Sequence, residues 1–461
     1  MTREHKANAD GQENRSAGEQ AYREELIARG PFPEGFRAGV GTLEFTPVER
    51  PEGGAAGMNM AVLAADEPTD VFAGLFTRSA FPGAPVVLGR RQLDEPTLQG
   101  VVINNKVSNV CSPRGLEDTR RLADETSRLL AAAGAGGEGS GDGAEDRSRQ
   151  VGEARGGHPV LSSSTGVIGW ALPVEEMLAT LPKVVDGLGG ATPLDVAEAI
   201  MTTDRFPKLR SVSVGEGRIL GIAKGAGMVE PNLATMLVFI VTDVTMTRQE
   251  LREDLAAVVE ESFNAISVDG DQSTSDTVLA WSSRRKPAVP RERFREALGE
   301  VCAGLAEDIV RNGEGTAHVI RVTLEGAADR EEARLLGKAI CNSPLVKTAI
   351  YGNDPNVGRI IMALGDAAGR HGLGMDPDKV TVSLGEEVIF REGVFHLDRD
   401  KESRLCDYLK NTAMDPGLDG YPQHQRRVEI QVDVARGAER DSVLGTDLTH
   451  DYIRVNADYR T

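Results

Sequence analysis

The sequence has few cysteines, few aromatic residues and no long apolar run. Its four cysteines, Cys111, Cys302, Cys341 and Cys406, are scattered over 461 residues and form no CxxC pair. This spacing argues against a disulfide framework and against a zinc site. No apolar stretch approaches the length of a membrane-spanning helix, and the first twenty residues lack the apolar core of a signal peptide. We therefore expect a protein of the reducing cytoplasm.

Positively charged residues are also fewer than negatively charged ones. The chain has 52 Lys and Arg residues against 71 Asp and Glu residues, which gives a formal net charge of −19. Such a chain is repelled by nucleic acid and by anionic lipid surfaces, so we expect neither as a partner. No GxxxxGK[ST] segment is present, and the seven histidines show no HExxH spacing. The sequence therefore gives no support for nucleotide binding or for a histidine metal site.

Two regions are poor in large apolar side chains. Residues 1–30 are polar and mixed in charge, and we interpret them as a disordered N-terminal extension. Residues 132–157 are rich in glycine and charge, and we interpret them as a flexible insertion. Elsewhere helical and period-two patterns alternate, with strands expected around Ile320, Val382 and Val432. The pattern is typical of a mixed α/β or α+β chain with several antiparallel strands.

The most informative segment is Gly221–Asp243, in which a Gly-rich stretch with Lys224 leads into the apolar run Met236–Val241. A threonine, Thr235, stands where loop becomes strand. An N-terminal nucleophile enzyme needs this arrangement, because the hydroxyl attacks the preceding carbonyl and cleavage frees an α-amine that serves as base. The alternative is a Gly-rich turn before a core strand. The residues alone leave both interpretations open.

Three further segments offer polar groups. Leu161–Gly169 is a Ser/Thr-Gly turn whose hydroxyl and N–H groups suit an oxyanion hole, or it is an ordinary polar turn. Asn312–Thr316 places Glu314 between glycines, either to bind an ammonium group or as a solvated turn. Ser267–Thr277 has the acidic spacing of a calcium loop, but Thr274 and Ala280 replace its glycine and bidentate glutamate. We interpret this last segment as a hydrogen-bonded turn near the site.

In this order, these segments resemble those of the ornithine acetyltransferase (glutamate N-acetyltransferase) family. The family typically carries KGxGMxxPNxATML, and Lys224–Leu237 reads KGAGMVEPNLATML. Its STGVIG turn matches Ser164–Gly169, and its SVDGD-ST-DT segment matches Ser267–Thr277. The other matches are Ile200–Asp204 with Pro207–Lys208, Gly313–Gly315, Asn342–Ala349, Gly352–Arg359 and the terminal NADYRT. The resemblance spans roughly Phe36 to Thr461.

The resemblance implies a chemistry. The precursor would cleave itself between Ala234 and Thr235, and Thr235 would carry an acetyl group from N-acetylornithine to glutamate. Thr165 and Gly166 would form the oxyanion hole, and no metal or organic cofactor is needed. The residues implied to bind substrate are Thr202, Lys224, Thr235, Glu314, Asn456 and Thr461.

The resemblance also implies an architecture. The family fold is a layered α-β-β-α sandwich, cleaved into two chains that stay associated and usually pair further. Here the N-terminal chain would run over 31–234 after the extension, and the C-terminal chain would be 235–461.

Several positions depart from the family pattern. They are Lys106 and Pro113 in place of glycines, Val107 in place of an asparagine, Arg205 in place of a threonine, His318 in place of a lysine and Val357 in place of a tryptophan. An intact catalytic segment in altered surroundings fits acetyl transfer, but it also fits transfer of another acyl amino acid or an amidohydrolase. A non-catalytic homologue is the third hypothesis, although such a protein would not need a scissile Ala-Thr bond.

Overall fold

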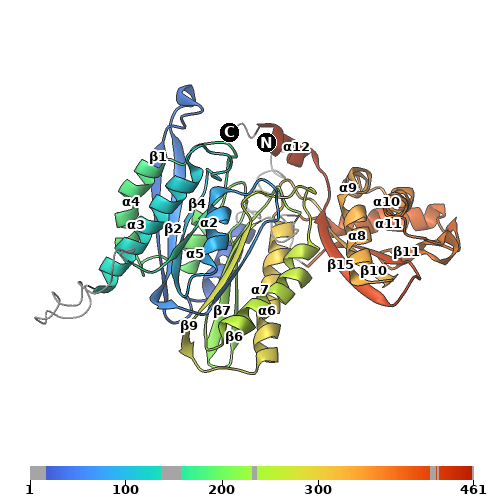
Figure 1. Ribbon diagram of the computed structural model, residues 1–461. Helices are drawn as coiled ribbons and strands as arrows, with labels where there is room; N and C mark the ends of the chain where they lie inside the picture. Colours follow the sequence, from blue (N-terminus) through green and yellow to red (C-terminus); the bar gives the residue numbers. More distant parts are fainter. Residues whose placement is uncertain (1–16, 136–156, 231–235, 416–421, 423–424, 459–461) are drawn as a thin grey trace, which may run out of the picture.

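The computed structural model describes residues 17–135, 157–230, 236–415, 422 and 425–458. Within these residues the chain forms three β-sheets. Two of the sheets stack face to face with helices on their outer sides, and the third lies to one side with helices of its own (Figure 1). No helix among the described residues is long and apolar enough to cross a bilayer.

The first sheet has the strand order β1-β2-β4-β5. Its strands are β1 (Phe36–Phe45), β2 (Ala56–Thr69), β4 (Leu98–Asn104) and β5 (Val160–Ser164). Alternate residues of β2 face opposite cores: Met60 and Val62 pack toward helices α3 (Gly115–Ala135) and α4 (Val174–Asp186), whereas Ala61 and Leu63 face the second sheet. This period-two division lets one apolar strand serve two layers.

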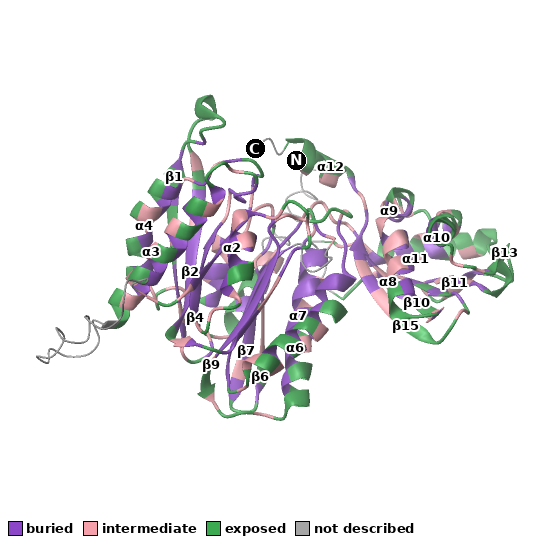
Figure 2. Ribbon diagram, in the orientation of Figure 1, coloured by how far each residue is buried: buried purple, intermediate pink, exposed green. Residues whose placement is uncertain are grey.

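The second sheet has the order β3-β9-β8-β7-β6. Its strands are β3 (Phe72–Phe76), β9 (Thr277–Lys286), β8 (Leu237–Val244), β7 (Gly217–Lys224) and β6 (Lys208–Val214). All residues of β8 are buried, which confirms the strand predicted from the apolar run at 236–241. On its outer face this sheet packs against α6 (Arg248–Glu261) and α7 (Arg291–Arg311). Figure 2 shows that the strands of both sheets lie largely out of solvent.

The two sheets share an apolar core that includes Leu63, Phe239 and Trp281. Helices, sheet, sheet and helices therefore follow one another, so the predicted layered α/β sandwich is confirmed for this part of the chain. Short helices α2 (Ala84–Gln92) and α5 (Pro193–Ala199) contact strands of both sheets and fill the edges of the sandwich.

The third sheet has the order β13-β12-β11-β14-β10-β15. Its strands are β10 (Val319–Ala327), β11 (Thr381–Leu384), β12 (Glu387–Arg391), β13 (Val394–Phe395), β14 (Val428–Asp433) and β15 (Glu439–Thr446). A separate apolar core joins it to helices α8 (Arg330–Asn342), α9 (Pro344–Tyr351), α10 (Val357–Arg370) and α11 (Arg399–Thr412). The strands predicted around Ile320, Val382 and Val432 are confirmed and all belong to this third sheet. After β15, α12 (His450–Asp458) brings the chain back toward the sandwich.

Two predictions about unstructured regions need correction. Residues 17–28 form a helix, and its Tyr22 and Leu26 are buried in the core between the two stacked sheets. Spaced four residues apart, these side chains share one helical face. The disordered extension predicted for 1–30 is therefore wrong for the described residues 17–30. The insertion predicted at 132–157 begins inside α3, while residues 1–16 and 136–156 lie outside the described residues.

Candidate active site

A pocket of about 170 Å³ lies where β5, β7 and β8 meet the loops at one edge of the sandwich. Six of the predicted site residues line it: Thr165, Gly166, Thr202, Lys224, Glu314 and Asn456. Ala234, Thr235 and Thr461 lie outside the described residues. Met236, the next residue after Thr235, also lines the pocket. Sequence segments more than 200 residues apart are thus brought together around the start of β8.

The turn after β5 supplies the oxyanion candidates. The N–H of Thr165 donates to the carbonyl of Asn104 at 3.1 Å, so this N–H is already occupied. The hydroxyl of Thr165 accepts a hydrogen bond from Lys224 Nζ at 2.8 Å, which leaves its own proton to donate. The N–H of Gly166 has no acceptor among the described residues. A hydroxyl and a backbone N–H are therefore both available as donors at the pocket wall.

Gly166 is held close to the chain around Lys106. A Cβ at Gly166 would lie 2.2 Å from the carbonyl carbon of Lys106, and the φ of Gly166 is +124°. Only glycine fits both the space and the backbone conformation. Lys106 itself has a φ of +75°, in a region of backbone conformation that favours glycine. The family that the sequence resembles has a glycine at this position. This close approach fixes the turn that carries Thr165 and Gly166.

Lys224 is the cation of the pocket. It ends β7 and donates to the hydroxyls of Thr165 and Thr202, the latter at 3.1 Å. Burial lowers the pKa of Lys224, while the charge of Asp204 opposes this shift. Among the described residues this ammonium donates only to hydroxyl groups, and such a desolvated cation is well suited to meet a substrate carboxylate.

Beneath Lys224 lies a buried ion pair. Lys208 Nζ is 2.6 Å from Asp204 Oδ1, and neither side chain is exposed to solvent. Asp204 also accepts hydrogen bonds from the N–H of Gly225 at 2.7 Å and the N–H of Thr202 at 3.1 Å. Although burial opposes ionisation, Lys208 and Lys224 hold the pKa of Asp204 below its usual range. The carboxylate thus orients Gly225, which follows Lys224 in the chain, and Thr202, whose hydroxyl accepts from Lys224.

Glu314 provides a carboxylate in the same pocket as Lys224. It lies in the loop after α7, where its N–H donates to the carbonyl of Ala226 at 2.8 Å. Its carboxylate accepts a hydrogen bond from Asn456 Nδ2 of α12 at 2.7 Å. A Cβ at Gly227 would lie 2.5 Å from this carboxyl group, so glycine is what allows Glu314 to approach the Gly-rich segment. The carboxylate and Lys224 line the same small pocket.

The turn at Ser267–Thr277 packs beside the site, as predicted. Asp269 accepts hydrogen bonds from the N–H groups of Met228 and Val229 at 2.7 and 2.8 Å, and from the Tyr452 hydroxyl at 3.2 Å. Its carboxylate therefore braces the Gly-rich segment. Among the described residues no cluster of His, Cys, Asp or Glu has the arrangement of a metal site.

Most of the departures from the family pattern have structural roles. Val107 is fully buried and bridges to Val167. His318 is buried, with Nδ1 2.8 Å from Asp447 Oδ2. Val357 packs in the core of the third sheet. Arg205 differs, because it lines a neighbouring cavity of about 610 Å³ that also reaches Thr203 and Glu314 of the site.

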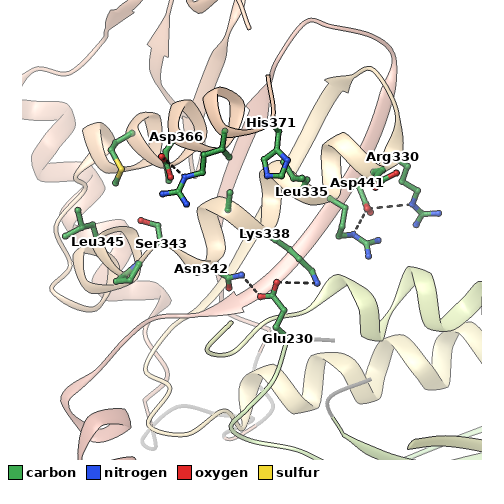
Figure 3. A pocket seen from close by; sticks show the side chains of 18 of the residues that line it. Glu230, Arg330, Leu335, Lys338, Asn342, Ser343, Leu345, Asp366, His371 and Asp441 are labelled. Carbon is green, nitrogen blue, oxygen red and sulfur yellow. Dashed lines mark hydrogen bonds and ion pairs between the residues drawn. The ribbon is translucent and has the colours of Figure 1, made fainter. Parts of the chain in front are cut away.

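A larger cleft of about 1060 Å³ lies between the sandwich and the helices of the third sheet (Figure 3). Its charged groups largely pair with one another, as in Arg334 with Asp441 at 2.6 Å. On one wall Glu230 accepts a hydrogen bond from Asn342 and lies 3.7 Å from Lys338. None of the predicted site residues lines this cleft. We therefore place the candidate active site in the smaller pocket.

Comparison with known proteins identifies the family. The model of the ArgJ family matches residues 52–461. The chain belongs to the ArgJ family. An arginine biosynthesis bifunctional protein ArgJ of Thermus thermophilus is 36% identical over 434 residues, covering 93% of this chain and 99% of the relative. That of Geobacter sulfurreducens is 36% identical over 416 residues, covering 88% and 95%.

Solved structures give related matches. A crystal structure of an arginine biosynthesis bifunctional protein ArgJ from Bacillus halodurans is 34% identical, with a TM-score of 0.42, and covers 48% of this chain and 98% of that chain. An ornithine acetyltransferase from Mycobacterium tuberculosis, solved with ornithine, is 28% identical, with a TM-score of 0.32, and covers 45% and 98%. The ArgJ family match spans every described site residue.

Sequence reasoning missed two features of this ArgJ family site. It included Asp204 and Lys208 in matching segments but did not predict that they form a buried pair. It noted the segment that contains Asp276 without expecting this carboxyl group in the pocket wall. An aspartate and a lysine four residues apart were the available signal for the first, while nothing local indicated the second.

Proposed function

We propose that this ArgJ family member transfers an acetyl group from N-acetylornithine to glutamate, through an acetyl ester on Thr235. The observation that carries the proposal is the shared pocket: an ammonium, a carboxylate and two candidate oxyanion donors surround the start of β8. Because Thr235 directly precedes Met236 in the chain, the same pocket is where its hydroxyl would act.

Maturation comes first in this proposal. The Thr235 hydroxyl attacks the Ala234 carbonyl, and hydrolysis of the resulting ester leaves chains 1–234 and 235–461. The freed α-amine of Thr235 then serves as the base for its own hydroxyl. The N-terminal chain of the fold then comprises the region 31–234 together with the helix at 17–28 that packs in the core.

Acyl transfer uses the donors already described. The Thr235 oxygen attacks the acetyl carbonyl of the donor, and negative charge develops on the carbonyl oxygen. The N–H of Gly166 and the hydroxyl of Thr165 stabilise that charge. The Lys224 ammonium, which donates to the Thr165 hydroxyl, polarises it further. Collapse releases ornithine, and glutamate takes up the acetyl group in the second half of the cycle.

Substrate recognition rests on charge. Lys224 binds the α-carboxylate, and Glu314 binds the side-chain ammonium of ornithine. Thr202 and Asn456 flank these two groups, and Thr461 is a further proposed substrate-binding residue. The chemistry requires no metal or organic cofactor. We place the enzyme in the cytoplasm, with its two chains associated and paired into a dimer of two-chain units.

One observation favours a related reaction as the second candidate. Arg205 lines the cavity next to the site, at a position where the resembled family commonly has threonine. A guanidinium there would select a substrate with an additional anionic group. The alternative is therefore transfer, or hydrolysis, of a different acyl amino acid by the same Thr235 nucleophile.

Intact mass measurement tests the proposal. Wild-type protein should appear as two chains split at Ala234–Thr235, and N-acetylornithine should add one acetyl mass to the C-terminal chain. Thr235→Ala should stay in one piece, while Thr180→Ala, at a half-buried threonine on α4 away from the pocket, should behave as wild type.

Each other outcome has a defined meaning. Cleavage without acetylation, followed by acylation from other acyl amino acids, would support the alternative substrate. An uncleaved wild type that takes up no acyl group would refute an enzymatic role.

A further inference from the structure

Asp276 is a carboxyl group of the pocket to which the proposed reaction has so far given no role. It directly precedes β9 and lines the same pocket as Thr165, Lys224 and Glu314. The next residue, Thr277, donates its N–H to the carbonyl of Met236 at 2.9 Å. Asp276 therefore lies directly before the strand that pairs with β8, close to Met236, the residue that follows Thr235.

The side chain of Asp276 is unusual for a carboxyl group. The residue is 2% exposed, and its Oδ2 atom is buried without a hydrogen-bond partner among the described residues. An unpaired buried carboxylate is costly, whereas a neutral carboxylic acid is much less so. Burial raises the pKa of Asp276 well above its ordinary value. This effect outweighs the hydrogen bonds from the hydroxyls of Ser273 and Thr77 and from the N–H of Met236, and also the charge of Lys224. Burial therefore favours the protonated form of this group.

The acetyl transfer reaction needs such a proton. When the C–N bond of N-acetylornithine breaks, the nitrogen must be protonated to leave as an amine. The Thr165 hydroxyl and Gly166 N–H face the oxyanion, and Lys224 and Glu314 are assigned to substrate charges. Among the described charged residues of the pocket, Asp276 alone has no assigned task.

We propose that Asp276 is the general acid that protonates the departing amine, and the base that later deprotonates the incoming one. This inference rests on the proposed function. This assigns a further catalytic residue to the site. It also gives a reason for a buried carboxyl group at the pocket wall whose Oδ2 atom has no hydrogen-bond partner among the described residues.

The proton balance closes over the two half-reactions. In the first, the Thr235 hydroxyl proton passes to the Thr235 α-amine, the Oγ–C bond forms, the C–N bond breaks, and Asp276 gives its proton to the leaving nitrogen. In the second, the carboxylate of Asp276 takes a proton from the ammonium of the acceptor. The new C–N bond forms, the ester bond breaks, and the α-ammonium returns a proton to Oγ. The acceptor nitrogen releases its second proton to solvent, which matches the proton that the first product amine takes up.

The test compares two donors that differ only in the leaving atom. In a thioester analogue of N-acetylornithine, sulfur replaces the amide nitrogen, so a thiolate leaves and no proton is required. The carboxylate and ammonium that meet Lys224 and Glu314 are unchanged. Asp276→Asn should acetylate Thr235 from N-acetylornithine about 10²- to 10⁴-fold more slowly than wild type, the usual effect of losing a general acid. Its rate with the thioester should stay close to that of wild type.

The matched control is Asp271→Asn, which removes an exposed carboxyl group from the same loop and should leave both rates unchanged. An equal loss with both donors would mean that Asp276 only shapes the pocket, and an unchanged amide rate would also overturn the proposal. A wild-type enzyme that accepts neither donor would instead refute the proposed function.

A wild-type measurement covers the case in which Asp276→Asn fails to fold or to cleave. With the amide donor, acetylation should slow at alkaline pH as Asp276 loses its proton, whereas the thioester should show no such loss. Lys224 and Glu314, the other charged groups lining the pocket, contact both donors alike. An equal loss of acetylation rate at alkaline pH with both donors would overturn the proposal.

Discussion

The ion pair of Asp204 and Lys208 should dominate the stability of the site, and Asp204→Asn tests this directly. The substitution keeps the shape of the side chain and one oxygen for the N–H of Gly225. However, it leaves the Lys208 ammonium, which has no solvent exposure, without its anion. Breaking one partner of a buried pair typically costs about 3–5 kcal/mol, because the other charge stays buried and uncompensated.

A second substitution separates the charge from the shape. Replacing both residues, as Asp204→Asn with Lys208→Met, removes the stranded cation together with its partner. Buried pairs exchanged for uncharged groups of similar volume are often close to neutral. The double variant should therefore recover most of the stability that the single variant loses.

Urea unfolding followed by tryptophan fluorescence measures this effect. Trp281 is fully buried between the two stacked sheets and reports on the sandwich. The variants belong in a Thr235→Ala background, so that every sample is one chain. The pKa of Asp204 is held below its ordinary 3.8 when folded, so its stabilisation is complete above that pH and fades only as pH falls further. The cost should therefore be equal at pH 5 and pH 8. A loss under about 1 kcal/mol, or a double variant as unstable as the single one, would refute the reasoning.

Two further substitutions test the pocket itself. Thr165→Val should slow acetylation of Thr235 about 10²- to 10³-fold, since an oxyanion donor is lost, whereas Thr165→Ser should keep most of the rate. Equal losses in stopped-flow acetylation assays would show that the hydroxyl has no special role. Glu314→Gln should raise KM for N-acetylornithine roughly 10- to 100-fold with little change in kcat, because a charged hydrogen bond to the substrate contributes about 1.5–3 kcal/mol. An unchanged KM in steady-state kinetics would remove Glu314 from ammonium binding.

Local patterns predicted much of the secondary structure. The apolar run at 236–241 became the fully buried strand β8, because a central strand in a two-sided sheet needs no polar face. The sequence also shows Thr247 three residues before Glu250, and these two residues form the capping box of α6. Thr247 accepts from the N–H of Glu250, and the Glu250 carboxylate accepts from the N–H of Thr247. Both features depend on residues within a few positions of one another, so the sequence displays them directly.

Long-range features were not accessible in this way. Strands β10 and β14 pair in parallel although 108 residues separate Ile320 from its partner Val428. No local pattern specifies such a pairing. Asp276 lies in the segment that the sequence indicates as a hydrogen-bonded turn, and its burial becomes visible only in the structure. The six pocket residues were named through the family resemblance, whereas their shared geometry comes from the fold.

The strand order of the second sheet has a consequence for the protein if it is cleaved between Ala234 and Thr235 as proposed. Its order, β3-β9-β8-β7-β6, alternates between the two sides of the Ala234–Thr235 bond. Strands β3, β7 and β6 precede the bond, while β9 and β8 follow it and lie between them. Neither of the two proposed products contains all five strands of this sheet, so the proposed cut would follow folding. Once cut, a molecule that unfolds must find its other half again by diffusion, and the stability of the mature protein becomes a function of its concentration.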